Sequence, residues 1–256
     1  NKNINLDYKY TGVKSNKPSF ILFTSGSTGE PKGIVHSTGG YLVYAKYTCK
    51  KKFNISSNKT ILTASDAGWI NGHTYSLYGP LSLGATTILL EKPMILLNDD
   101  IMQKILINLR VNILYLPVTL IRLIKSIKSN TKFKSQYLKL LGSMGEPLSK
   151  YVGEWFSKNF STKKLQIVNT YFQTETAGII CSPGFNDNIA DVPLGTVGKQ
   201  ITKKLGVFID KSLKAKKAEI KIKNPWPGCM VNIINNKKIF DEYWDENNNF
   251  RLFDLA

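Results

Sequence analysis

The first two thirds of the chain alternate between short apolar runs and longer segments whose apolar residues recur at helical spacing. The short runs have the length of strands and lie at 19–24, 33–37, 59–65, 85–91, 111–117, 138–145 and 165–172. The helical patterns lie at 38–53, 74–84, 98–110, 118–127 and 148–160. Strands separated by helices of about ten residues need crossover connections. The pattern therefore predicts an α/β fold with a mostly parallel sheet layered with helices.

Local signals mark the boundaries of several predicted helices. Asn98 or Asp99 can cap the helix that follows them, because short polar side chains accept hydrogen bonds from the first free N–H groups. Pro147 precedes the last helix, since proline cannot sit in a helix interior. By the same reasoning, Gly79-Pro80 predicts a break in the second helix.

The pattern changes in the last third of the chain. Glycine, proline and aspartate turns are dense between 182 and 199, and short alternating segments follow, such as 218–224 and 229–234. This texture predicts a small, mostly antiparallel β subdomain. We therefore expect an α/β core over 1–182 and a β subdomain over 183–256.

Length and composition fit a globular protein. At 256 residues and 42% hydrophobic, the chain can bury a substantial core, and none of its apolar runs is long enough to anchor it in a membrane. Its first residues lack both an initiator Met and a signal pattern, which indicates a piece of a longer polypeptide. Cys49, Cys181 and Cys229 show no CxxC spacing, which argues against a disulfide framework or a zinc site and favours a cytoplasmic location.

The net charge of +17 raises the alternative of a nucleic-acid or anionic-membrane binder. Most of the excess is lysine, however, and it is scattered along the chain rather than gathered in one segment. No zinc-finger spacing, aromatic ribonucleoprotein motif or basic leucine zipper is present in the sequence. We therefore interpret the charge as solvated surface and expect no nucleic-acid partner.

The loop "TSGSTGEPKG" is rich in glycine and hydroxyl residues and follows an apolar run. Gly26 and Gly29 permit backbone angles that direct N–H groups toward an anion, and Lys32 adds a mobile positive charge suited to phosphate. The hydroxyl donors of the loop are Thr24, Ser25, Ser27 and Thr28. The spacing matches neither GxxxxGK[ST] nor GxGxxG. Its chemistry nevertheless indicates a polyphosphate ligand.

The same loop resembles the phosphate-binding signature of the adenylate-forming superfamily. Four further stretches match in the same order: "ASDAGWINGHTYSLYGPLSLGATTIL", "LLGSMGEPLS", "NTYFQTETAG" and "WPG" with the closing "FRLFDLA". Together they resemble the short-chain acyl-CoA synthetase branch, which includes acetyl-CoA synthetase. The complete polypeptide of that family is more than twice this length. The resemblance therefore implies the central portion of such an enzyme, without its N-terminal portion or its C-terminal lid.

The resemblance implies roles for the first motifs. The loop from Thr24 to Gly29 would wrap the β- and γ-phosphates of ATP, with Lys32 supporting it. The turn Gly145-Glu146-Pro147 would lie against the adenine. From the residues alone this turn is also a strand-to-helix connection, and both interpretations are compatible because ligands bind at the carboxyl edge of such sheets.

The "TYFQTE" stretch would supply the remaining contacts to the nucleotide. Tyr171, Phe172 and Gln173 would lie near the base. Thr174 would contact the α-phosphate, and Glu175 would bind Mg²⁺, since a carboxylate beside hydroxyls suits a hard cation shared with phosphates. Without the other motifs, Glu175 is more simply interpreted as a surface residue.

Asp254 occupies the position of a carboxylate that accepts both ribose hydroxyls in the family. The family pattern there is Thr-Gly-Asp, whereas this chain has Leu252 and Phe253 before the aspartate. Because the small glycine is lost, we expect crowding beside the ribose.

The resemblance also implies an acyl pocket, lined by Trp69, Ile70, Asn71, Met144 and Phe172. Packing in a core would explain Trp69 equally well. Phe172 and Met144 are bulky, and overfilling a packed pocket costs about 1 to 3 kcal/mol. These side chains therefore favour an acid of two or three carbons over a fatty acid, without deciding between acetate and propionate.

The implied reaction joins a short carboxylate to AMP with release of pyrophosphate, and then transfers the acyl group to coenzyme A. Lys32, Thr174 and Glu175 would be the catalytic residues, acting by positioning and electrostatics. The substrates and cofactors implied are a small carboxylate, ATP, Mg²⁺ and coenzyme A. Because the lid is missing, we expect the isolated piece to turn over poorly. A degenerate homologue that binds the adenylate without turnover is the alternative.

Overall fold

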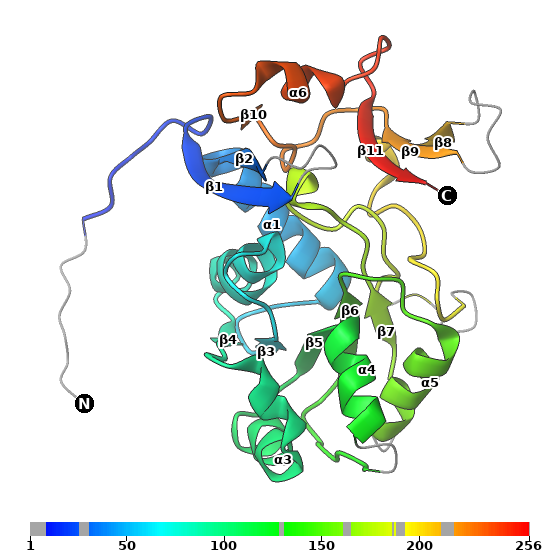
Figure 1. Ribbon diagram of the computed structural model, residues 1–256. Helices are drawn as coiled ribbons and strands as arrows, with labels where there is room; N and C mark the ends of the chain where they lie inside the picture. The colour runs from blue at the N-terminus through cyan, green and yellow to red at the C-terminus, as the bar shows by residue number, and fades with distance from the viewer. Residues whose placement is uncertain are drawn as a thin grey trace.

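The computed structural model describes residues 9–25, 31–127, 131–160, 165–185, 187, 193–210 and 218–255. At its centre lies a five-stranded sheet of order β4-β3-β5-β6-β7, in which every neighbouring pair is parallel (Figure 1). Its strands are β3 (Thr60–Thr63), β4 (Thr86–Ile88), β5 (Ile113–Pro117), β6 (Leu140–Met144) and β7 (Ile167–Asn169). This sheet confirms the predicted α/β class.

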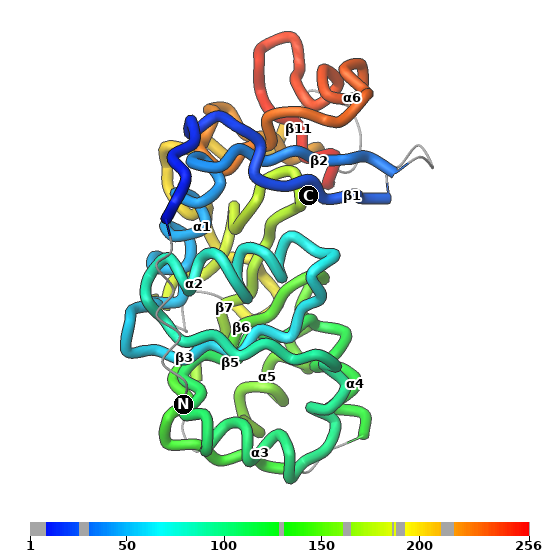
Figure 2. Tube along the Cα trace, turned by 90° about the vertical axis from the view of Figure 1, so that its left-hand side faces the viewer, coloured from blue at the N-terminus to red at the C-terminus, as the bar shows by residue number. Residues whose placement is uncertain are grey.

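Helices cover both faces of the parallel sheet (Figure 2). One face packs against α3, α4 and α5 through Leu62, Leu114 and Leu141. The other packs against α1 and η1 through Ile61 and Ile113, because successive side chains of a strand point to opposite faces. The helices are α1 (Thr38–Phe53), the π-helix η1 (Gly72–Tyr78), α2 (Gly79–Ser82), the 3₁₀ helix η2 (Pro93–Leu97), α3 (Asp99–Asn108), α4 (Val118–Ile127) and α5 (Lys150–Asn159). Within the described residues, no helix has the length and apolar character needed to cross a membrane.

Two small antiparallel sheets lie beyond the carboxyl edge of the parallel sheet. Their orders are β1-β2-β10 and β11-β9-β8. The strands are β1 (Pro18–Ser25), β2 (Pro31–Ser37), β8 (Val207–Asp210), β9 (Glu219–Ile222), β10 (Asn232–Ile233) and β11 (Phe250–Leu255). Short helices accompany them: η3 (Thr174–Thr176), η5 (Lys203–Leu205) and α6 (Lys237–Glu242).

The first two strands lie outside the parallel sheet, although the alternating pattern groups them with it. β1 and β2 pair antiparallel, with Leu22 opposite Ile34, because no helix separates them. The far edge of β2 pairs with β10, where Ile34 lies opposite Ile233. One sheet thus joins the start of the chain to its tail, and the division into units at residue 182 stays a prediction.

The predicted break at Gly79-Pro80 does not occur. Instead, the π-helix η1 continues directly into α2, which contains Pro80. Gly79 N–H donates to the Thr74 carbonyl, five residues back, as in a π-helix. Pro80 has no N–H for the Ser76 carbonyl, which instead accepts a hydrogen bond from the Thr87 hydroxyl at 2.6 Å. The wider turn and this hydroxyl together accommodate the proline.

Candidate functional site

Three cavities open where the carboxyl ends of the parallel strands face the antiparallel sheets, and Gln173 lines all three. We name each after one lining residue: the Lys32 cavity of about 470 Å³, the Pro147 cavity of about 1290 Å³ and the Met144 cavity of about 530 Å³. Ligands of open α/β sheets bind outside this edge. Because the cavities share lining residues, they can hold connected parts of one elongated ligand.

The Lys32 cavity contains a linked pair of opposite charges. Lys32 Nζ donates to Tyr243 Oη at 2.7 Å, and Tyr243 Oη donates to Glu175 Oε1 at 2.8 Å. Burial and then the Glu175 carboxylate raise the pKa of Tyr243, so the phenol keeps its proton. Glu175 is only 8% exposed, which rules out the alternative of a surface residue. Thr24 and Ser25 line the same cavity.

The donor set of this cavity fits Mg²⁺ held jointly with phosphates. Among the described residues, Glu175 Oε2 accepts no hydrogen bond, and the buried Thr24 hydroxyl has no partner. Within the same part of the chain, no three His, Cys, Asp or Glu side chains gather as a metal centre. Mg²⁺ is usually held by one or two carboxylates together with substrate phosphates and water, so one carboxylate beside hydroxyls is sufficient.

The Pro147 cavity brings the predicted nucleoside contacts together, since Gly145, Glu146, Pro147, Tyr171, Phe172 and Asp254 all line it. Asp254 Oδ2 accepts hydrogen bonds from Tyr171 Oη and Gln173 Nε2, both at 2.7 Å. Burial and the bond to Asp254 raise the pKa of Tyr171, so this phenol also stays a donor. Arg122, which the sequence did not single out, fixes the turn through a 2.7 Å ion pair with Glu146.

Phe253 adopts a left-handed backbone conformation, with φ of 57°. Only glycine adopts this conformation without strain, and the family pattern has glycine here. The pairing of β11 with β9 is irregular between Arg251 and Leu255, around this residue. Phe253 lines the Lys32 cavity rather than the Pro147 cavity. The bulk that replaces glycine therefore lies on the side of Lys32.

The Met144 cavity is lined by all five residues predicted for an acyl pocket: Trp69, Ile70, Asn71, Met144 and Phe172. Trp69 is 67% exposed, so it is not a core residue. Ile70 and Met144 are buried and form an apolar wall of the cavity. Asn71 is also buried, and its amide has no hydrogen-bond partner among the described residues. Phe172 and Gln173 border both this cavity and the Pro147 cavity.

The turn that carries Thr174 and Glu175 is held by its own side chains. Gln173 and Thr176 form a reciprocal cap around η3, and Gln173 N–H donates to Thr176 Oγ1 at 2.9 Å. Ala177 then takes a left-handed conformation, with φ of 60°, and ends the helical turn. These contacts are local and follow from the sequence "QTETA".

Distant elements hold the carbonyl groups of the same turn. His36 Nε2 lies 2.7 Å from the Thr174 carbonyl, and burial lowers the pKa of His36 to about 4. The imidazole is therefore neutral at pH 7 and donates through Nε2, since a carbonyl can only accept. The next three carbonyls, of Glu175, Thr176 and Ala177, accept from Met230 N–H, Trp226 Nε1 and Thr74 Oγ1 at 3.0, 3.3 and 2.6 Å.

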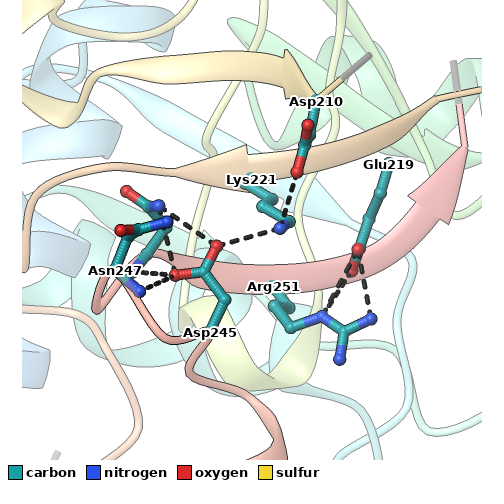
Figure 3. Close-up of polar contacts among 7 residues, drawn as sticks. Asp210, Glu219, Lys221, Asp245, Asn247 and Arg251 are labelled. Atoms are coloured by element: carbon teal, nitrogen blue, oxygen red, sulfur yellow. Dashed lines mark hydrogen bonds and ion pairs between the residues drawn. The ribbon is translucent and has the colours of Figure 1, made fainter. Parts of the chain in front are cut away.

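An ion cluster ties β11 to β8 and β9 (Figure 3). Lys221 Nζ lies between Asp210 and Asp245, at 2.8 and 2.9 Å. Arg251 forms three hydrogen bonds to Glu219, at 3.1, 3.3 and 3.2 Å. Burial alone would raise the pKa of Asp245, but hydrogen bonds from Lys221 and from the following loop lower it overall. The cluster fixes the strand that carries Phe253 and Asp254.

The predicted loop residues Gly26, Ser27, Thr28 and Gly29 lie outside the described residues, so their role stays a prediction. The sequence did not single out Tyr243, which is 68 residues from Glu175 and 211 residues from Lys32. Tyr243 belongs to no sequence motif, so only its contacts in the structure identify it as part of the site. The same is true of His36, whose ring reaches the turn after β7 from β2.

Comparisons with known proteins identify the fold and the family. The crystal structure of the anthranilate CoA ligase AuaEII in complex with anthranoyl-AMP matches the fold with a TM-score of 0.79 at 15% identity, over 94% of this chain and 45% of that chain. The chain thus shares the fold of the corresponding part of that ligase. The family model for AMP-binding enzymes matches residues 3–231. The chain belongs to the AMP-binding enzyme family, as its motifs predict.

Its sequence relatives include acetyl-coenzyme A synthetases. The chain is 37% identical over 238 residues to the acetyl-coenzyme A synthetase of Vibrio vulnificus (strain YJ016), covering 90% of this chain. It is 35% identical over 242 residues to that of Helicobacter pylori (strain G27), covering 91% of this chain. It spans 36% of the length of each of these synthetases.

Phe253→Gly and Phe253→Ala separate backbone strain from the loss of the ring. Both variants remove the aromatic side chain, but only glycine relieves the left-handed conformation. We expect the glycine variant to be more stable than the alanine variant by about 1 kcal/mol, measured by urea unfolding. Equal stabilities, or a more stable alanine variant, would contradict the strain at this position.

Lys221→Met tests the ion cluster through its pH dependence. Since the folded state lowers the pKa of Asp245, this carboxylate stabilises the fold above its unfolded pKa of about 3.9, and the stabilisation is lost as pH falls below that value. We expect Lys221→Met to reduce the free energy of unfolding by about 3 kcal/mol at pH 6, because two carboxylates lose their partner. The loss should shrink at pH 3. The exposed Lys223→Met is the control, and a loss independent of pH would refute this account.

Proposed function

We propose that the full-length protein activates a short-chain carboxylate with ATP, forming an acyl-adenylate and then an acyl-CoA, with release of pyrophosphate and AMP. One observation carries this proposal: three cavities with different chemistry meet at Gln173. One holds a lysine and a carboxylate, one is bordered by the turn at Pro147 and by Asp254, and one has apolar walls. Family membership and the acetyl-coenzyme A synthetase relatives support the same function.

The Lys32 cavity is the proposed place of the β- and γ-phosphates. Lys32 Nζ supplies a positive charge there, and Thr24 and Ser25 line the cavity with hydroxyl groups. The rest of the loop, to Gly29, would add N–H and hydroxyl donors, as its sequence predicts. Mg²⁺, held by Glu175 and the phosphates, would neutralise charge on the leaving pyrophosphate. Thr174 directly precedes Glu175 and lines the Met144 cavity. From this position it would contact the α-phosphate, which would lie between the Lys32 cavity and the Met144 cavity.

The Pro147 cavity is the proposed nucleoside site. The turn at Gly145 would lie against the adenine, together with Tyr171. Asp254 would accept hydrogen bonds from the ribose hydroxyls, since its second oxygen has no hydrogen bond from the described residues. Tyr171 and Gln173 already fix the first oxygen, which orients the carboxylate before the nucleotide binds.

The Met144 cavity is the proposed acyl pocket. Met144 and Phe172 line it with bulky side chains, which supports acetate or propionate over longer acids. A single methylene changes discrimination by about 1 to 3 kcal/mol, so both acids are candidate substrates. Trp69 borders this cavity and the Lys32 cavity, and would cover the carboxylate beside the phosphates.

Catalysis in this proposal comes from position and charge. Holding the carboxylate in line with the α-phosphate converts a bimolecular attack into a step within one complex. The carboxylate oxygen attacks phosphorus, and the bond to pyrophosphate breaks. The ammonium of Lys32 stabilises the negative charge that develops on the leaving group. The thiol of coenzyme A then attacks the acyl carbon and releases AMP.

Calorimetric titration of the full-length protein with the propyl ester of AMP, which mimics an acyl-adenylate, tests the proposal. We expect saturable binding that survives added salt, because the ligand has a single phosphate and its site is specific. Thr174→Val should weaken binding about tenfold, since a hydrogen bond to a charged group contributes about 1.5 kcal/mol. Thr86→Val, on an exposed position of β4 outside all three cavities, is the matched control.

Two outcomes of this titration, and one of a parallel assay of acyl-CoA formation, count against the proposal. Absence of binding by the folded protein would refute an adenylate site. Binding that collapses with salt would favour a basic surface that attracts polyanions. Tight, salt-resistant binding without formation of acyl-CoA from acetate or propionate would favour the degenerate homologue, for which Phe253 in place of glycine is the structural argument.

A further inference from the structure

The hydroxyl of Tyr243 links the two charged groups of the Lys32 cavity. It accepts a hydrogen bond from Lys32 at 2.7 Å and donates one to Glu175 at 2.8 Å. Among the described residues, Lys32 and Glu175 form no direct ion pair, so the phenol is their connection. The ammonium also lies 5.1 Å from the centre of the Tyr243 ring. A phenol can do this because its oxygen both accepts and donates.

The ring of Tyr243 is held in turn by Phe253. The two rings meet edge to face at 5.0 Å, and the Arg251 guanidinium lies 4.5 Å from the centre of the Phe253 ring. Arg251 is itself fixed by Glu219. Left-handed conformations of residues other than glycine cost free energy and persist where the surroundings determine them. Here the surroundings are the aromatic contact with Tyr243 and the cation above the ring.

We propose that Tyr243 is a positioning residue of the phosphate and metal site, and that Phe253 is retained in its strained conformation to support it. This inference rests on the proposed function. Tyr243 engages one oxygen of Glu175 and leaves the other available to Mg²⁺. It also keeps the ammonium of Lys32 beside the carboxylate, where both face the same cavity. A hydrogen bond to a ligating carboxylate typically changes metal affinity by about 10- to 100-fold.

The measurable consequence is the coupling between Mg²⁺ and nucleotide. We define it as the ratio of two dissociation constants for ATP, measured by calorimetry with EDTA and with Mg²⁺ on the full-length protein. Tyr243→Phe removes only the hydroxyl and keeps the ring that contacts Phe253. The ratio should fall about tenfold in this variant, while the midpoint of thermal unfolding stays close to that of the wild type.

Three further variants give the test its controls. Tyr47→Phe removes a hydroxyl on α1, outside the three cavities, and should leave the ratio unchanged. Phe253→Ala and Phe253→Gly both remove the ring that supports Tyr243, so both should lower the ratio, whichever backbone they favour. If Phe253 acts only through stability, the ratio should instead follow the free energy of unfolding. It should then differ between the alanine variant and the glycine variant.

The outcomes distinguish this inference from the proposed function. If the wild type binds ATP more tightly with Mg²⁺ and Tyr243→Phe keeps the full ratio, the positioning role is refuted and the proposed function stands. If Tyr243→Phe weakens ATP binding equally with Mg²⁺ and with EDTA, the hydroxyl does not act on the metal site, which also refutes the inference. If the folded wild type binds no ATP under either condition, both proposals fall.

Discussion

Four consecutive carbonyl groups, of residues 174 to 177, each accept a hydrogen bond from a different distant residue. Two donors come from β2 and η1, and two from the segment before β10. Buried carbonyls without partners are costly, so this turn can be buried only where all of these elements meet. The rest of the site depends on that meeting point, because the same turn carries Thr174 and Glu175.

This constraint explains how two kinds of sheet form one site. The parallel sheet delivers the turn after β7. The antiparallel sheets deliver Lys32 and Asp254 to its other side, and the end of α6 delivers Tyr243. The ion cluster keeps β11 in place, even though Phe253 in this strand has a strained backbone conformation. The ion cluster on one side of β11 therefore holds the charged groups on the cavity side in fixed positions. Electrostatic catalysis requires preorganisation of this kind.

The sequence predicted those parts of the structure that depend on local pattern. Helix 38–53 was predicted with its observed bounds, and the parallel sheet follows from strands separated by helices. The residues predicted for the acyl pocket line one cavity, and the residues predicted near the base line another. Thr174, predicted to contact the α-phosphate, lines the Met144 cavity rather than the Lys32 cavity, and Gly26 to Gly29 lie outside the described residues. Their individual roles remain proposals.

Features that depend on contacts between distant segments were not predictable. β2 pairs with β10 across almost two hundred residues, a relation that no periodicity records. Pro80 predicts a helix break, but the helix continues because a hydroxyl from β4 donates to the carbonyl that Pro80 leaves without a partner. Tyr243 belongs to no motif, and its importance arises from the fold. The Phe253 position was suspect in the sequence, yet the side on which its ring lies could only come from the structure.

The most direct test of the central claim is carboxylate-dependent exchange of labelled pyrophosphate into ATP by the full-length protein. If the three cavities form one activation site, exchange should require acetate or propionate and should disappear in Glu175→Gln. Exchange that proceeds without a carboxylate, or its absence from a folded protein supplied with both acids, would contradict the account.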